Sequence, residues 1–195
     1  MPEKTYEQST YFVMIKHMTA EIPQNKPDQE KREILDDNAR KFIVGPIDKS
    51  FLQEHGASSF KLIVDWLETS EDNEIKVAYK DFGNGNIQIL LIAKTTVDGN
   101  RTSKKKKITE EEYEQLKSSS IQHLEKTRYE FSYTQNDIPF SMKYDEFAES
   151  DLRVLEVDAS NEQERNSFNP DSFSIELEEV TGDMQYYGYR VAEVV

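Results

Sequence analysis

The stretch TSKKKKITEEEYEQL places four consecutive lysines directly before an acidic segment. A β-rich run, IQILLIAKTTV, and the turn signal DGN precede it, so the basic stretch is expected to form the return strand of a hairpin. On such a strand Arg101, Lys105 and Lys107 share one face, while Lys104 and Lys106 share the other. Ammonium and guanidinium groups gathered on one face can bind phosphate groups. A solvated surface is the alternative interpretation.

Other charged residues follow the same alternation on the neighbouring predicted strands. The basic members are Lys94, Lys126 and Arg128, and the acidic members are Asp145, Glu156, Asp158 and Glu179. If these faces share one interior, one wall is basic and another acidic, and apolar positions such as Phe131 and Leu155 pack outside it under helices. The alternative is that the charged faces point to water and apolar side chains fill the interior.

The elements that must position these residues are mostly strands joined in local hairpins. About eight strand-like runs, separated by turn signals, lie between ARKFIVG and SIELEEVTG. Helices are expected in IDKSFLQEH, which ends at Gly56, in TEEEYEQLKSSS, where Thr109 and Glu112 form a capping box, and in NEQERNSF. The pattern predicts an α+β fold, an eight-stranded antiparallel β-barrel (tunnel) with a few flanking helices.

Composition restricts the partners. The chain has 195 residues and a formal net charge of −14, which opposes the binding of a long nucleic acid but leaves a small polyanion possible at a local basic site. No cysteine is present, the N-terminus lacks signal-peptide features, and no apolar run is long enough to cross a bilayer. We therefore expect a cytoplasmic protein without a membrane span.

An ordered series of motifs between Asp37 and Glu193 resembles the CYTH superfamily, the triphosphate tunnel metalloenzymes. LEKTRYEF resembles the family's I-x-K-x-R strand, YDEF its Asp strand, LRVLEVDAS its E-V-E strand, and EEVTGDMQYYGYRVAEV its closing E-V-T segment. IAKT resembles its T-x-K. The superfamily also includes proteins labelled class IV adenylate cyclases and thiamine triphosphatases. The resemblance implies a tunnel domain over residues 37–195, preceded by a proline-containing polar extension, residues 1–36.

The departures from the family pattern concern carboxylates. DNARK stands for the family's E-x-E-x-K and puts Ala39 at the second glutamate, and RTSKK stands for R-x-E-x-E with Ser103 and Lys105 at the glutamate positions. The phosphate-binding residues that the resemblance implies are Lys41, Lys94, Arg101, Lys105, Lys126 and Arg128. The implied ligands of Mg²⁺ or Mn²⁺ are Glu156, Asp158 and Glu179, with Asp37 and Asp145 as further candidates.

Three functions follow from these residues. The first is a metal-dependent triphosphatase that acts on inorganic or nucleoside triphosphate. The second is a catalytically impaired tunnel protein that binds triphosphate, polyphosphate or a nucleotide without a metal, as the missing carboxylates suggest. The third is a vestigial tunnel whose N-terminal extension docks a protein partner of unknown identity.

Overall fold

The computed structural model describes residues 39–70, 72–97 and 100–194. The predicted extension, residues 1–36, and Asp37 lie outside these residues. The described chain contains nine strands and four α-helices, so the predicted α+β class is confirmed. Hydrogen bonding orders the strands as β5-β4-β3-β2-β6-β7-β8-β1-β9. Among the described residues this sheet has two ends instead of closing, and it has one strand more than the predicted eight.

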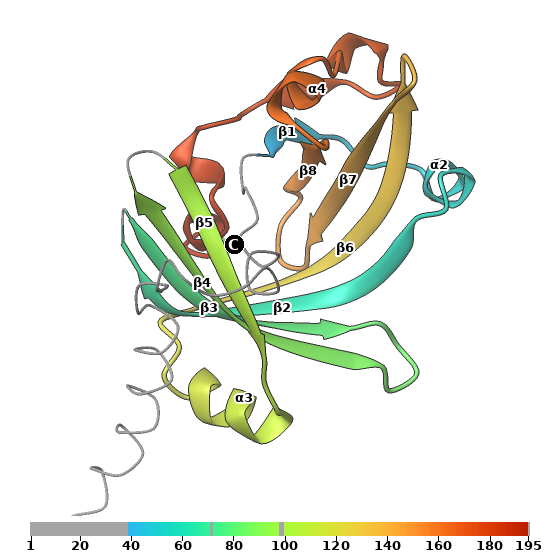
Figure 1. Cartoon of the computed structure of the whole chain (residues 1–195). Coiled ribbons are helices and arrows are strands. Elements are labelled where there is room, and N and C mark those ends of the chain that lie inside the picture. Colours follow the sequence, from blue (N-terminus) through green and yellow to red (C-terminus); the bar gives the residue numbers. More distant parts are fainter. Residues whose placement is uncertain (1–38, 71, 98–99, 195) are drawn as a thin grey trace, which may run out of the picture. The chain divides into compact units, whose positions relative to one another are not determined.

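Figure 1 labels the elements along the chain. The strands are β1 (Arg40–Val44), β2 (Ser58–Thr69), β3 (Asn73–Asp81), β4 (Ile87–Val97), β5 (Asn100–Lys107), β6 (Gln122–Gln135), β7 (Ile138–Phe147), β8 (Arg153–Asp158) and β9 (Leu177–Glu179). The α-helices are α2 (Lys49–Glu54), α3 (Glu110–Lys117), α4 (Glu162–Asn166) and α5 (Gly188–Val191), and the 3₁₀ turns are η2 (Pro170–Ser172) and η3 (Met184–Tyr186). None of the described helices has the length and apolar character needed to cross a membrane.

The described residues fall into two compact units. We call residues 66–77 and 89–121 the β4–β5 unit, and residues 39–65, 78–88 and 122–194 the β6–β8 unit. Strands β2 and β3 contribute to both.

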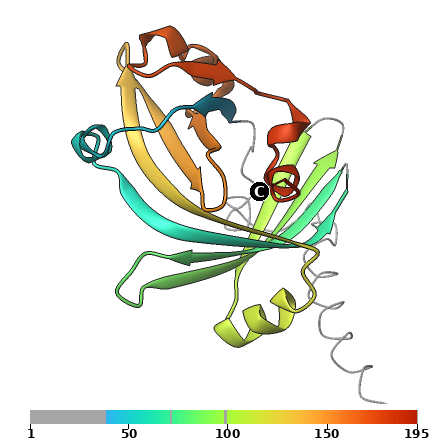
Figure 2. The ribbon, with the colours of Figure 1, turned by 180° about the vertical axis from the view of Figure 1, so that it is seen from behind.

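The β6–β8 unit is built on the long β6–β7 hairpin, which both views show as a curved pair of strands (Figures 1 and 2). Strand β7 pairs with β8, β8 with β1, and β1 with β9, all antiparallel. Because directly opposed residues point to the same face, the register defines two faces. Phe131 opposes Met142, and Leu155 opposes both Tyr144 and Phe42, so these apolar residues share a face.

Helices and turns cover this apolar face. The main core cluster combines the strand residues with Leu52 of α2 and with Phe168 and Phe173 from the α4–η2 region. Phe168 packs edge to face on Phe42 and Phe140, with ring centroids 5.7 and 5.2 Å apart. The prediction that Phe131 and Leu155 pack under helices is confirmed.

Helices α2, α3 and α4 lie within the three predicted helical stretches, and α5 was not predicted. Gly56 follows α2 with φ of +63°, a conformation that glycine adopts without strain. The N–H of Glu112 donates to Oγ1 of Thr109 at 3.1 Å, and the N–H of Thr109 donates to the Glu112 carboxylate at 2.7 Å, so the capping box at α3 is confirmed. Asn161 caps α4 by accepting from the N–H of Glu164.

The β4–β5 unit contains the lysine-rich hairpin that the sequence predicts. Its register opposes Lys94 to Ser103, Ile92 to Lys105 and Leu90 to Lys107. Helix α3 follows β5 and buries Tyr113 and Leu116.

The core of the β6–β8 unit is tested by Leu155→Ala. Leu155 is fully buried, and its truncation should lower the free energy of unfolding by about 2 to 5 kcal/mol because it leaves a cavity. Urea denaturation measures this. Val194→Ala is the control, since Val194 is 81% exposed, and it should have almost no effect. Equal stabilities of the two variants would contradict the assigned face of β8.

Candidate functional site

The second face of the β6–β8 unit carries the charged residues. Arg128 of β6 opposes Asp145 of β7, and Glu156 of β8 opposes both Lys143 of β7 and Lys41 of β1. Alternation puts Lys126 on the same face, two residues before Arg128. The register therefore brings six charged residues from four adjacent strands to one side of the sheet. They are Lys41, Lys126, Arg128, Lys143, Asp145 and Glu156. We call these six residues the charged face.

Asp145 is the buried centre of the charged face, with 1% of its surface exposed. Its Oδ1 accepts from Nε of Arg128, and its Oδ2 accepts from Nη2 of Arg128 and from Nζ of Lys126, each at 2.6 Å. Burial alone would raise the pKa of Asp145, but Arg128 and Lys126 outweigh it and hold the pKa below its ordinary value. Asp145 is therefore ionised, and its hydrogen bonds hold the side chains of Lys126 and Arg128 in place.

Glu156 lies beside this pair and is partly accessible, with 22% of its side chain exposed. Its Oε2 is 3.5 Å from Nη2 of Arg128. Burial would raise the pKa of Glu156, but the surrounding cations keep it well below the usual range. These cations are Arg128, Lys41, Lys126 and Lys143. One carboxylate thus has four positive neighbours.

Several hydrogen-bond donors of these cations have no acceptor within the described residues. Nη1 of Arg128 is one, because Nε and Nη2 make all the hydrogen bonds of this side chain. The ammonium groups of Lys41 and Lys143 make no hydrogen bond to described residues either, although Nζ of Lys41 lies 4.9 Å from the centre of the Tyr187 ring. Donors from three strands are thus available to an anionic ligand.

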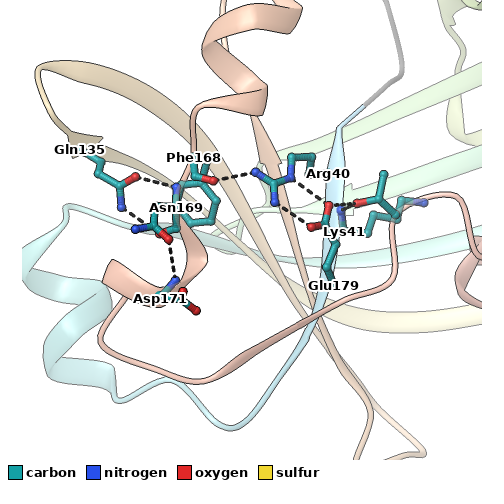
Figure 3. A network of polar contacts seen from close by, with 8 residues as sticks. Arg40, Lys41, Gln135, Phe168, Asn169, Asp171 and Glu179 are labelled. Carbon is teal, nitrogen blue, oxygen red and sulfur yellow. Dashed lines mark hydrogen bonds and ion pairs between the residues drawn. The ribbon is translucent and has the colours of Figure 1, made fainter.

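Glu179 does not join the charged face. It opposes Phe42 and therefore points to the apolar side of the sheet, where its carboxylate forms a fork with Arg40 at 2.9 and 2.7 Å. Figure 3 shows that Arg40 and Lys41 leave β1 in different directions. Nη1 of Arg40 also donates to the carbonyl of Phe168 at 2.7 Å, so Glu179 and Arg40 connect β9 and β1 with the α4–η2 region.

Asp158 lies at the end of β8. Its Oδ1 accepts from the N–H of Ala159 at 2.9 Å and is 3.7 Å from Nη1 of Arg165, a buried residue of α4. The register puts Asp158 on the same side of the sheet as Glu156, but its side chain contacts Ala159 and α4, and no contact with Asp145 or Glu156 is found in the described part of the chain.

The β4–β5 unit holds the remaining predicted phosphate-binding residues. Lys94 and Lys105 share one face by register, together with the buried Ser103. The Lys105 side chain is exposed, and the Arg101 side chain lies outside the described residues.

Glu74 is a buried carboxylate of the same unit that sequence reasoning missed. Nε1 of Trp66 donates to its Oε1 at 2.9 Å, and Nζ of Lys76 donates to the same oxygen. Burial would raise the pKa of Glu74, but Lys76 and Lys94 lower it well below the usual range. Lys94 is therefore close to a fixed negative charge.

Lys143 was also missed. It stands two residues before Asp145 on β7, so period-two alternation could have placed it on the charged face.

Those predicted metal ligands that the structure describes do not fit a divalent cation in this arrangement. Mg²⁺ needs several oxygen ligands at once, and the described residues contain no group of three acidic or histidine side chains that could hold a metal. Asp145 and Glu156 converge, but cations already occupy them. Two unit charges 4 Å apart interact by about 4 kcal/mol at an effective dielectric constant of 20, and the repulsion doubles for a divalent ion beside each lysine or arginine.

Two solved structures superpose on most of this chain. A crystal structure described as the inorganic triphosphatase NE1496 superposes with a TM-score of 0.55 and 22% identity, over 80% of this chain and 94% of that chain. A second structure, described as the hypothetical protein NE1496, gives 0.54 and 24%, over 79% and 95%. No family model matches the sequence, and no curated protein does. At these identities the likeness shows a shared fold.

The Asp145 ion cluster is tested by Asp145→Asn. At pH 7 this change should lower the free energy of unfolding by about 3 to 5 kcal/mol, because it removes the charge of the carboxylate to which both Lys126 and Arg128 donate. The pKa of Asp145 is depressed in the folded state, so its stabilisation is complete above the unfolded pKa, about 3.8, and is lost as pH falls below it. The difference between wild type and variant should therefore shrink on acidification.

Urea denaturation at a series of pH values measures this difference. Asp151→Asn is the matched control, since Asp151 is exposed in the turn before β8. A stability difference for Asp145→Asn that is independent of pH would contradict the ion cluster.

Proposed function

We propose that the chain is a member of the triphosphate tunnel superfamily and binds a small polyanion of the triphosphate class on the charged face. The observation that carries the proposal is the set of four cations around Glu156. The cations are Lys41, Lys126, Arg128 and Lys143. Within the charged face they outnumber the two carboxylates, Asp145 and Glu156, and the register adds Glu130 and Asp158 to the same side of the sheet.

The arrangement suits a ligand with several anionic groups in a row. Adjacent strands lie about 4.8 Å apart, so cations on β1, β6 and β7 can contact a chain of phosphoryl groups at several points. Guanidinium and ammonium donors form short, charge-assisted hydrogen bonds to phosphate oxygens. The donors of Arg128, Lys41 and Lys143 that have no acceptor within the described residues supply such contacts.

Lys94, Arg101 and Lys105 remain proposed phosphate-binding residues of the β4–β5 unit. The β4–β5 register supports Lys94 and Lys105, because it puts both on one face.

Binding is tested by isothermal titration with inorganic triphosphate. Lys41→Met and Lys143→Met should each weaken the affinity about tenfold or more, because each removes a charge-assisted contact. Lys61→Met is the matched control: Lys61 has a half-exposed side chain that pairs with Glu125, so its variant should bind like wild type. Equal losses in all three variants would indicate a general charge effect and would contradict the assigned site.

Hydrolysis of inorganic triphosphate is a second candidate function. It is supported by the shared fold with NE1496, which is described as an inorganic triphosphatase. The groups of this chain that would stabilise the phosphoryl oxygens are those of the charged face, above all Arg128.

The second candidate is tested by measuring phosphate release from inorganic triphosphate, with and without Mg²⁺. If the chain is a triphosphatase, Arg128→Ala should lower the rate by about 100-fold, because a preorganised donor to the developing charge is lost. Lys61→Met should retain the rate. Release from wild type that does not exceed that of Arg128→Ala would leave binding as the function.

A further inference from the structure

We infer that the charged face recognises its anion without a divalent cation, because Asp145 and Glu156 serve as fixed counterions of the lysines and arginine. This inference rests on the proposed function and specifies how its ligand is held. It differs from the first function expected from the sequence, in which the same carboxylates would bind Mg²⁺ or Mn²⁺.

The contacts of Asp145 leave little room for a metal. Both oxygens are used by cations, in three hydrogen bonds of 2.6 Å, and the carboxylate is 1% exposed. A divalent ion would have to displace the Arg128 fork or approach between a guanidinium and an ammonium group. Either step opposes binding electrostatically.

Glu156 occupies a different position. Its side chain is partly exposed, and its closest cation, Arg128, is 3.5 Å away, a longer contact than any at Asp145. An incoming anion would meet the same cations that surround Glu156. The anion and Glu156 therefore compete for Arg128, Lys41 and Lys143.

The other carboxylates named as ligands are engaged elsewhere. Glu179 is held by Arg40 on the opposite face, and Asp158 contacts Arg165 of α4. Within the described residues of the β6–β8 unit, no third carboxylate from the predicted ligand set complements Asp145 and Glu156. The two that converge are neutralised by cations.

The first experiment compares titrations of wild-type protein with inorganic triphosphate in EDTA and in Mg²⁺. We expect binding in EDTA, with Mg²⁺ leaving the affinity unchanged or weakening it, because Mg²⁺ neutralises part of the triphosphate charge. Binding only with Mg²⁺, or a gain of more than about tenfold on adding it, equivalent to about 1.4 kcal/mol, would overturn the inference alone. No binding under either condition would overturn the proposed function and the inference with it.

The second experiment uses Glu156→Gln, which keeps the shape of the side chain and removes its charge. If Glu156 competes with the ligand for the cations, removal of its charge should make triphosphate bind about tenfold more tightly in EDTA. A metal ligand should give the opposite result, a loss of binding in Mg²⁺. Unchanged affinity would also overturn the inference.

Glu149→Gln is the matched control for the second experiment. It removes the same charge from an exposed position between β7 and β8, and its affinity should stay close to that of wild type. Thermal unfolding of each variant shows whether it is folded. If Glu156→Gln does not fold, the wild-type comparison in EDTA and Mg²⁺ decides the question.

Discussion

The buried carboxylate of Asp145, held between Lys126 and Arg128, is the interaction on which the β6–β8 unit depends. Transfer of these three groups from water is costly, and the cost is offset only when hydrogen bonds satisfy both oxygens and both cations are in place. Two of the three groups lie on β6 and one on β7, so the ion cluster forms only in the observed β6–β7 register. It thereby fixes the pairing of the longest hairpin.

The same register separates charge from the apolar core. A shift of one residue between β6 and β7 would turn Arg128 toward the helices and Phe131 toward the charged face. Phe168 and Phe173 cover the apolar face. The paired hydrogen bonds between Arg40 and Glu179 hold this region in place. A carboxylate outside the charged face thus supports the packing that keeps the charged face polar.

Local features of the fold could be predicted from the sequence, and long-range ones could not. The capping box of α3, the stop at Gly56 and the alternation of β6 depend on residues a few positions apart. The side on which Glu179 lies depends on how β9 pairs with β1, about 140 residues earlier, and a three-residue strand carries too little alternation to decide it. For the same reason the position of Lys41 beside Glu156 was not predictable. Within-strand periodicity shows which residues share a face, but it does not give the stagger between distant strands.

Charge balance connects the local site with the whole chain. A net charge of −14 repels an extended polyanion, which meets the average surface over its full length. At physiological ionic strength, charges more than about 8 Å apart are largely screened in solvent, so a compact anion responds mainly to the groups it touches. On the charged face Asp145 has already ordered Lys126 and Arg128, which in the proposed function reduces the entropy lost when a ligand binds. Under that proposal an acidic protein selects a small polyanion over a long one through a few local cations, two of which a buried carboxylate holds in place.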